Sequence, residues 1–559
     1  MSEKPASPIS ALEQPHPLTG DIDYSNAPAL ASMLSRVMLE VFDGMPGTNY
    51  PGLSDPAVIT AIEALGRRMA AIWSAPTPQR ILLAGGETTG RLAIYLGTQF
   101  NLALKAAGKN PCFIADMAGG PASFFGETQG REYDYEAGAD QWYVLTEAGP
   151  IALVIGLTAD LSTPYVCSML DSALGEDSTH VLLFGSVHSD EARHGQALPD
   201  GRSARDLIRA LTRMPQGEVL AVPVGPEPLI GATRSKSASA ALAVMISAFF
   251  HGFSGLPVAQ SLSALREATA LTSDSETIGE LIDIGNQVLR ANGRLYFVGR
   301  GSNGLLGIVE ASETIQLFCD PSSRVRGFCL GGVGCGLEAF AIHGAAMARR
   351  PKLRSHVSEA AYREAIHETG PSMVIALEQP PRRDPLMHDL VQLAVHAGGY
   401  ARRLVLPRVE AAQPYLAQWA WEFATRLALD FFSTGAHVLA GKTYSNRIIE
   451  IQLNTLALFD EAVCVVAELA QVSAEQARKS LVAAIYRGEM AVPPLSDISK
   501  HLAAAAGRTG LVARALLLAR GVPLQEALTL QSREPIVRKA MDLLNETRGG
   551  GRAAAGDSA

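Results

Sequence analysis

Threonines and glycines that follow an apolar run form the first candidate site. The segment 80–92 reads Arg-Ile-Leu-Leu-Ala-Gly-Gly-Glu-Thr-Thr-Gly-Arg-Leu, and the residues after it have helical spacing. A strand that ends in glycines and hydroxyls before a helix presents backbone N–H groups and hydroxyls to an anion. A phosphorylated small molecule is therefore the first ligand to consider.

Two later loops have similar chemistry. The loop 156–164 contains Thr158 and Ser162, and the loop 225–236 ends in Thr233-Arg234-Ser235-Lys236. Ligands of open parallel sheets bind at the carboxyl ends of the strands, where such loops meet helices. Each hydroxyl alone could be an ordinary helix cap. Three such loops in one half of the chain favour an anion site.

The pattern returns in outline at 294–306, which reads Arg-Leu-Tyr-Phe-Val-Gly-Arg-Gly-Ser-Asn-Gly-Leu-Leu. We therefore expect a tandem repeat of one α/β domain. The counterpart of the second loop, 378–384, contains no hydroxyl. The repeats have diverged, and the sequence predicts one phosphate site per chain.

Strand-like and helical segments alternate through most of the chain, which predicts parallel β-α-β units. Strands are expected at 81–84, 151–155, 181–184, 219–224, 295–298, 373–377 and 403–406. Helices are expected between them at 56–73, 163–174, 204–214, 277–291 and 385–396. Only helical segments follow residue 452, at 456–469, 474–486, 511–520 and 524–530.

These elements predict five segments. They are an N-terminal extension with a poorly ordered start (1–44), two α/β domains (45–274 and 275–451), a helical cap (452–546) and a disordered Gly/Ala-rich tail (547–559).

Composition excludes several classes of function. The 559 residues carry a net charge of −9 without a basic face, which argues against nucleic acid as a partner. The six cysteines form no C-x-x-C pair and read as reduced core residues, and no metal site or cofactor is expected. No signal pattern is visible, and the longest apolar helix candidate, 240–250, is too short to span a membrane. We expect a cytoplasmic protein.

Longer motifs carry a resemblance to a known family. The segment 225–236 resembles the signature G-P-E-x-L-x-G-[ST]-[ST]-R-x-K, with Ala232 at its first hydroxyl position, and 432–442 resembles an S-T-G…G-K segment followed by asparagines. Both are similar to proteins with sugar isomerase (SIS) domains, namely the glucokinase regulatory proteins and the related N-acetylmuramic acid 6-phosphate etherases. The segment Val325-Arg-Gly-Phe328 and the tandem layout resemble the regulatory proteins more. The resemblance implies two flavodoxin-like parallel-sheet domains and a helical cap.

The resemblance also implies a set of ligand contacts. Arg508 stands where the family has a lysine reaching in from the cap, and a guanidinium can bind phosphate there; as an alternative, Arg508 is a solvated surface charge. The implied phosphate contacts are Thr88, Thr89, Thr158, Ala159, Ser162, Thr233, Arg234 and Lys236.

Two acids depart from the family pattern. Glu87 stands where the family has a glycine, and Asp160 adds a carboxylate to the second loop. A carboxylate that points inward would repel phosphate. We expect these acids to face solvent, to pair with Arg91 or Arg234, or to alter the ligand preference.

Two glutamates decide between the functions that the resemblance implies. Glu132 and Glu313 take the places of the family's acid and base, and they would meet in one composite site if the halves pack as in an etherase dimer. Carboxylates also hold sugar hydroxyls without catalysis, and either residue could be structural. The expected function is a sensor of a hexose or amino-sugar phosphate that controls a sugar kinase, without catalysis. The alternative is an etherase that releases D-lactate. A glutamine-dependent sugar-phosphate aminotransferase also carries tandem domains of this type, but it needs an N-terminal cysteine as its nucleophile. Residues 2–20 contain no cysteine, which argues against this function.

Overall fold

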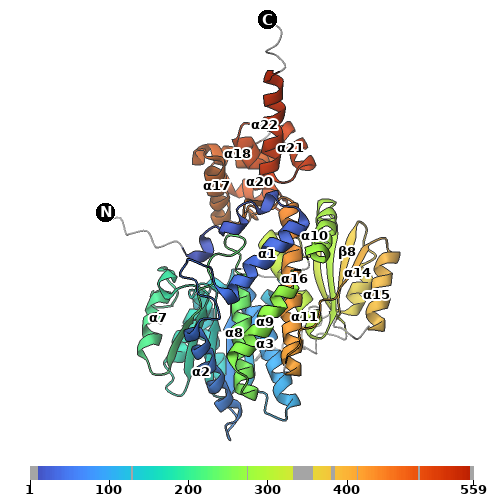
Figure 1. The fold of residues 1–559 in the computed structure, drawn as a ribbon. Coiled ribbons are helices and arrows are strands. Elements are labelled where there is room, and N and C mark those ends of the chain that lie inside the picture. The colour runs from blue at the N-terminus through green and yellow to red at the C-terminus, as the bar shows by residue number, and fades with distance from the viewer. Residues whose placement is uncertain are drawn as a thin grey trace.

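The computed structural model describes residues 10–126, 130–273, 275–330, 357–378, 384–411, 413–488 and 492–553. Figure 1 shows two α/β parts on either side of a central group of helices, with a helical cap at one end. The expected fold class is confirmed, with two parallel sheets in tandem and a C-terminal cap.

The first sheet has five parallel strands in the order β2-β1-β3-β4-β5, which is the flavodoxin-like order. Its strands are β1 (Arg80–Gly85), β2 (Phe113–Met117), β3 (Ile151–Leu157), β4 (His180–Gly185) and β5 (Gly217–Ala221). The helices between them are α3 (Glu87–Ala106), α4 (Gly120–Phe124), α5 (Tyr135–Glu147), α6 (Pro164–Leu174) and α7 (Ala204–Arg213). Of these strands, β2 was not predicted.

The second sheet has four described parallel strands in the order β7-β6-β8-β9. They are β6 (Arg294–Arg300), β7 (Val325–Leu330), β8 (Ser372–Leu377) and β9 (Tyr400–Leu404), with α11 (Ser302–Phe318), α14 (Glu359–Ala365) and α15 (Pro385–His396) beside them. The last strand begins three residues earlier than the prediction, and β7 was not predicted. Most of the predicted loop 378–384 lies outside the described residues.

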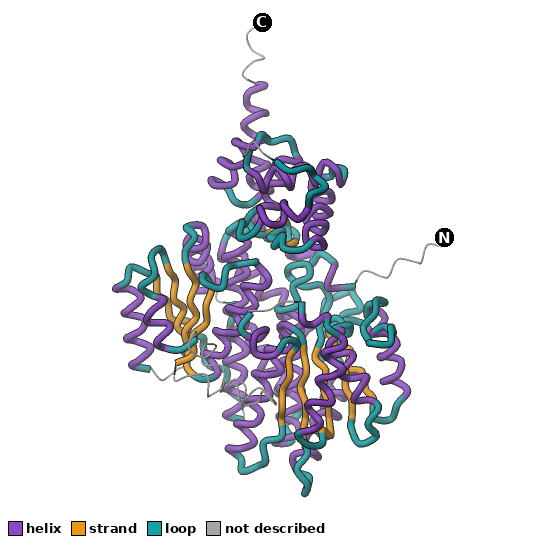
Figure 2. The backbone as a smooth tube through the Cα atoms, turned by 180° about the vertical axis from the view of Figure 1, so that it is seen from behind, coloured by secondary structure: helices purple, strands orange, loops and turns teal. Residues whose placement is uncertain are grey.

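Long helices fill the space between the two sheets (Figure 2). They include α1 (Ala27–Asp43), α2 (Pro56–Trp73), α8 (Lys236–Ser254), α9 (Val258–Leu271), α10 (Ser275–Arg290) and α16 (Pro414–Leu439). One hydrophobic core joins both halves, and in it Phe100 stacks on Phe249 at 4.4 Å between ring centroids. Helix α8 is longer than the apolar stretch 240–250 expected from the sequence, and it is long and apolar enough to cross a membrane, but 78% of its apolar window is buried inside the protein.

The cap has its own hydrophobic core. A short hairpin of β10 (Thr443–Tyr444) and β11 (Arg447–Ile448) leads into α17 (Leu456–Ala470), α18 (Ala474–Tyr486), α19 (Ile498–Ala505), α20 (Leu511–Ala519), α21 (Leu524–Arg533) and α22 (Val537–Ala553). Helix α22 therefore extends into the expected tail, and residues 554–559 lie outside the described residues.

The N-terminal segment, defined here as residues 10–24, is ordered, so a poorly ordered start does not extend to these residues. It forms three short 3-10 turns, Ala11–Glu13, Pro17–Thr19 and Ile22–Tyr24. The buried Asp23 carboxylate accepts hydrogen bonds from Ser445 N at 2.8 Å and from Arg538 Nη1 at 2.9 Å. The segment thus connects the start of the chain to the hairpin and to α22.

The cysteines partly follow expectation. Cys112, Cys167 and Cys329 are buried, Cys319 is half-buried, and Cys464 is exposed. Cys335 lies outside the described residues.

Candidate functional site

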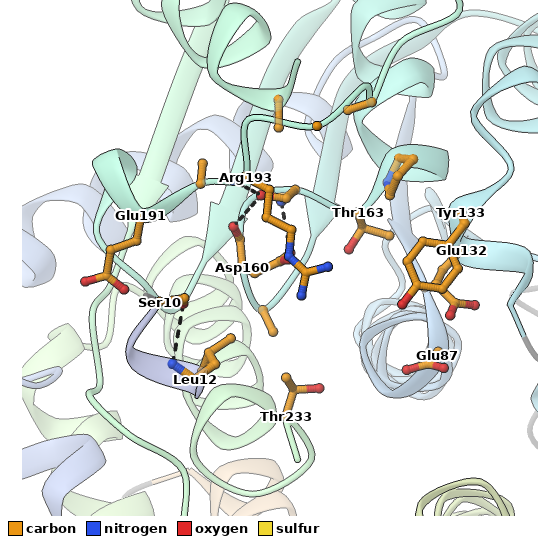
Figure 3. Close-up of a pocket in the computed structure, with 18 of the residues that line it drawn as sticks. Ser10, Leu12, Glu87, Glu132, Tyr133, Asp160, Thr163, Glu191, Arg193 and Thr233 are labelled. Carbon is orange, nitrogen blue, oxygen red and sulfur yellow. Dashed lines mark hydrogen bonds and ion pairs between the residues drawn. The ribbon is translucent and has the colours of Figure 1, made fainter. Parts of the chain in front are cut away.

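A cavity of about 740 Å³ opens at the carboxyl ends of the first sheet. The loops after β1, β3 and β4 line it, together with the turn Arg131–Tyr133 and the first residues of the N-terminal segment. Figure 3 shows Glu87, Glu132 and Tyr133 on one side and Ser10 with Glu191 on the other. This is the position at which ligands of open parallel sheets bind.

Helices α3 and α6 begin at this cavity without a side-chain cap. Gly86, which has no side chain, precedes α3, and the side chain of Thr163, which precedes α6, makes no bond to the first turn. The free N–H groups and the positive end of each helix dipole favour an anion. Capping therefore does not explain the hydroxyls of these two loops.

The structure brings five of the expected contacts to the cavity wall: Thr88, Thr89, Ala159, Ser162 and Thr233. Two of these hydroxyls already have partners, because Thr89 Oγ1 donates to Gly86 O at 2.8 Å and Ser162 Oγ donates to Asp160 O at 2.9 Å. Ser162 Oγ also accepts from Arg193 N at 2.8 Å, so each hydroxyl must turn its proton away from a carbonyl before it can donate to a phosphate.

Thr158 lies outside this wall. Its Oγ1 donates to Phe184 O at 2.6 Å and accepts from Leu161 N at 3.1 Å, so it closes the loop after β3. It is a structural residue in this geometry.

The structure does not bring Lys236 to the cavity. Its buried ammonium donates to Glu40 Oε2 at 2.8 Å, and the same oxygen lies 2.8 Å from His16 Nε2. The carboxylate of Glu227 caps the start of α8, where an anion could otherwise bind. It accepts hydrogen bonds from Lys236 N and Ser237 N, each at 2.8 Å. The glutamate of the G-P-E motif therefore shapes the third loop, a role that sequence spacing did not indicate.

Arg234 and Arg508 also lie outside this wall, although Arg234 lines an adjoining cavity. Arg234 Nη2 lies 2.7 Å from Asp430 Oδ1 and 3.2 Å from Glu310 Oε1, so its buried guanidinium joins the first half to α11 and α16. Arg508 Nη1 donates to Ile485 O inside the cap, and Arg508 lines neither this cavity nor its neighbour.

Asp160 has a different partner from the expected Arg91 or Arg234. Its Oδ2 lies 3.3 Å from Arg193 Nε, in the loop after β4. The same guanidinium lies 3.7 Å from Glu13. Arg193 thus offsets part of the negative charge of the cavity wall. The sequence does not identify this residue, because an arginine in a polar loop cannot be distinguished from an ordinary surface charge.

Glu87 and Glu132 form a carboxyl pair at the start of α3. A Cβ on Gly86 would lie 2.9 Å from Glu132 Cβ, so Glu132 packs directly on this turn. Burial, the charge of Glu87 and a hydrogen bond to Glu87 raise the pKa of Glu132 to about 7. Glu132 therefore gains and loses its proton near neutral pH.

Glu313 lies on an adjoining cavity of about 880 Å³ between the two halves and the cap. Both cavities share Glu13, Glu87, Thr88, Gly231 and Thr233 as lining residues. Glu313 is 4% exposed, and its Oε1 has no hydrogen-bond partner. Burial raises its pKa, while Arg426 and Arg234 oppose that shift.

Arg91 connects the two glutamates electrostatically. The buried guanidinium interacts with Glu313, Glu87 and Glu132. Its Nη2 also donates to Gln316 Oε1 of α11 at 2.8 Å, across the interface between the halves. The two glutamates thus face connected cavities that both halves build.

In the described part of the second repeat, the hydroxyl at the first turn is bonded inside the protein. Ser302 Oγ donates to the buried carboxylate of Glu422 at 2.6 Å, and Gln418 Nε2 donates to the same oxygen at 3.0 Å. The Ser302 hydroxyl is therefore already bonded to a buried side chain, which favours the first repeat as the phosphate site.

The comparisons with known proteins agree with this architecture. Residues 64–174 match the family described as glucokinase regulatory protein N-terminal SIS domain, and residues 445–541 match the C-terminal lid domain of glucokinase regulatory protein. The resemblance to tandem SIS-domain proteins is therefore confirmed.

Similarity extends over nearly the whole chain for one kind of relative. The glucokinase regulatory protein of Xenopus laevis is 24% identical, over 96% of this chain and 93% of its own length. The N-acetylmuramic acid 6-phosphate etherase of Synechocystis is 28% identical, over 40% of this chain and 75% of its own. Among solved structures, tagatose-6-phosphate ketose/aldose isomerase from Escherichia coli aligns at 11% identity, covering 78% of this chain and 98% of its own, with a TM-score of 0.41.

Proposed function

We propose that this chain is a regulatory protein that binds a sugar phosphate at the carboxyl ends of its first sheet. The main observation is that two uncapped helices and the hydroxyls of three loops meet at one cavity. Thr88, Thr89, Ser162 and Thr233 hold the phosphate in this proposal, and Glu132 and Glu313 accept bonds from sugar hydroxyls.

A sugar kinase is the proposed partner. This part of the proposal is supported by similarity to glucokinase regulatory protein along both halves and the cap. The domain bounds 45–274, 275–451 and 452–546 and a cytoplasmic location belong to the same proposal. Ligand in the connected cavities would contact both halves, and so would bias their arrangement.

A thermal-shift panel of hexose and amino-sugar phosphates tests the proposal. A binding ligand at a hundredfold excess over its Kd stabilises the protein by about 2.7 kcal/mol. Calorimetric titration is then expected to give one ligand per chain, with weaker binding after Thr89→Ala and unchanged binding after Ser302→Ala. Absence of any shift, or loss of binding through Ser302→Ala alone, would contradict the proposed site.

An etherase is the second candidate, because Glu132 has a pKa of about 7 and faces connected cavities with Glu313. A carboxyl group with this pKa can transfer protons near neutral pH. Against it, Glu87 and Asp160 add negative charge where the substrate would bring a second carboxylate. We expect no lactate from N-acetylmuramic acid 6-phosphate. Steady lactate release that Glu132→Gln abolishes would favour the etherase.

A further inference from the structure

The cavity that should hold a phosphate has an excess of acids. Its wall contains the carboxylates of Glu13, Glu87, Glu132, Asp160 and Glu191, while its basic side chains are Arg193 and His194. Simple anion binding does not explain such a wall, since like charges repel.

Most of these acids have partners of their own. Arg193 lies near both Asp160 and Glu13, and Glu191 Oε2 accepts from Ala11 N at 2.9 Å. The pair of Glu87 and Glu132 has no such ion pair in the described structure. The positive charge of Arg91 attracts the two carboxylates from within the core. Its nitrogens donate hydrogen bonds to Phe124 O, Ser123 O and Gln316 Oε1.

A second acceptor lies beside the adjoining cavity. Glu313 Oε1 is buried without a hydrogen-bond donor, and Glu313 shares its cavity with Glu87 and Thr88. A buried acceptor without a donor is costly unless a ligand supplies one. The walls of the connected cavities therefore favour a ligand rich in donors beside its phosphate.

We propose that the preferred ligand is a hexose phosphate with a free ammonium group, and that Glu87 and Glu132 bind this ammonium. The inference rests on the proposed function and specifies its ligand. An ammonium offers three donors and one positive charge, which match two adjacent carboxylates. A metal ion fits less well, because the described residues contain no group of three His, Cys, Asp or Glu side chains that could hold one.

The proposal predicts how ligand preference depends on pH. An ammonium binds best when both carboxyl groups are ionised, so its binding releases the proton of the pair. The preference for an ammonium sugar therefore rises with pH through the range in which the pair loses its proton. Among the described residues, the other ionisable groups near the pair include Arg91 on α3, Tyr133 on the facing turn, Asp160 and Arg193 on the loops after β3 and β4, Glu13 of the N-terminal segment, and Glu313 on α11.

The test compares matched ligands by calorimetry at pH 5.5 and 7.5. Glucosamine 6-phosphate is compared with glucose 6-phosphate, and glucosamine 1-phosphate with glucose 1-phosphate. Each pair has the same phosphate position, so phosphate titration largely cancels in the ratio of affinities. For the phosphate position that the protein binds, we expect the amino sugar to bind at least about tenfold more tightly than the plain sugar at pH 7.5. The ratio of the two affinities should be smaller at pH 5.5.

Variants identify the groups responsible. Glu87→Gln should reduce the preference to within about threefold, and Glu87→Gly should do the same if the glutamine variant folds poorly. Glu136→Gln removes an exposed charge from α5 outside the cavity wall and should leave the ratio unchanged. Equal binding of amino and plain sugars, or a preference that survives both Glu87 variants, overturns this inference alone. Absence of binding by every sugar phosphate overturns the proposed function as well.

Discussion

Glu87 adopts a backbone conformation that suits glycine. Its φ is +40°, in the left-handed region, which costs a residue with a Cβ about 1–2 kcal/mol. Glu87→Gly and Glu87→Ala both remove the charge, but only glycine relieves the backbone. We expect the glycine variant to have the higher free energy of unfolding, by about 1 kcal/mol, in urea denaturation. Equal stabilities would show that the turn is unstrained.

Glu132 makes the stability of the fold depend on pH. Its pKa rises from 4.5 in the unfolded chain to about 7 in the folded one, so the folded state binds more protons between these values. Stability should therefore fall as pH rises from about 4.5 to 7. Denaturation of the wild type and of Glu132→Gln across this range should show a shallower fall in the variant. Parallel curves would mean that Glu132 ionises normally.

At the scale of elements, Arg234 joins the loop before α8 to α11 and α16. Loss of one partner from a buried ion cluster leaves uncompensated charge and costs about 3–5 kcal/mol. Arg234→Ala should cost this much in denaturation experiments, because Asp430 and Glu310 stay buried. The control is Arg68→Ala, which breaks a partly exposed pair with Glu218 and should cost less than about 1 kcal/mol. Equal losses would contradict the interface role.

Strands with uninterrupted apolar runs could be predicted, and interrupted ones could not. The run in β1 is buried throughout after Arg80, which gives a clear signal. In β2, Asp116 interrupts the pattern, and only the fold reveals that Tyr165 and Gln141 satisfy its carboxylate. Helix α16 similarly buries charged side chains that local patterning cannot place.

The candidate site was predictable where it depends on local turns. Thr88, Thr89, Ser162 and Thr233 lie on the wall because each follows closely on a strand or precedes a helix. Lys236 does not, because its direction is set by Glu40, which lies 196 positions earlier in the chain. The local spacing of residues cannot indicate a contact between side chains that lie so far apart in the chain.

At the scale of the whole molecule, the N-terminal segment connects the first half to the cap. Asp23 is fully buried and Asp21 is 77% exposed, although both pair with Arg538. Asp23→Ala should cost about 1–3 kcal/mol, because Ser445 N also loses its acceptor. Hydrogen exchange should then increase in the hairpin and in α22. Asp21→Ala should leave exchange nearly unchanged, and equal effects would contradict this assignment.

The contact between Asp23 and Arg538 spans 515 positions of the chain. At a synthesis rate of roughly 5–20 residues per second, the ribosome needs about 25–100 s to make the second partner after the first. During that interval Asp23 has no partner in the cap, although Ala11 and His16 can already contact Glu191 and Glu40 of the first half. The contact between Asp23 and α22 is therefore among the last to form on a newly made chain, so translation speed should influence how the N-terminal segment first meets the cap.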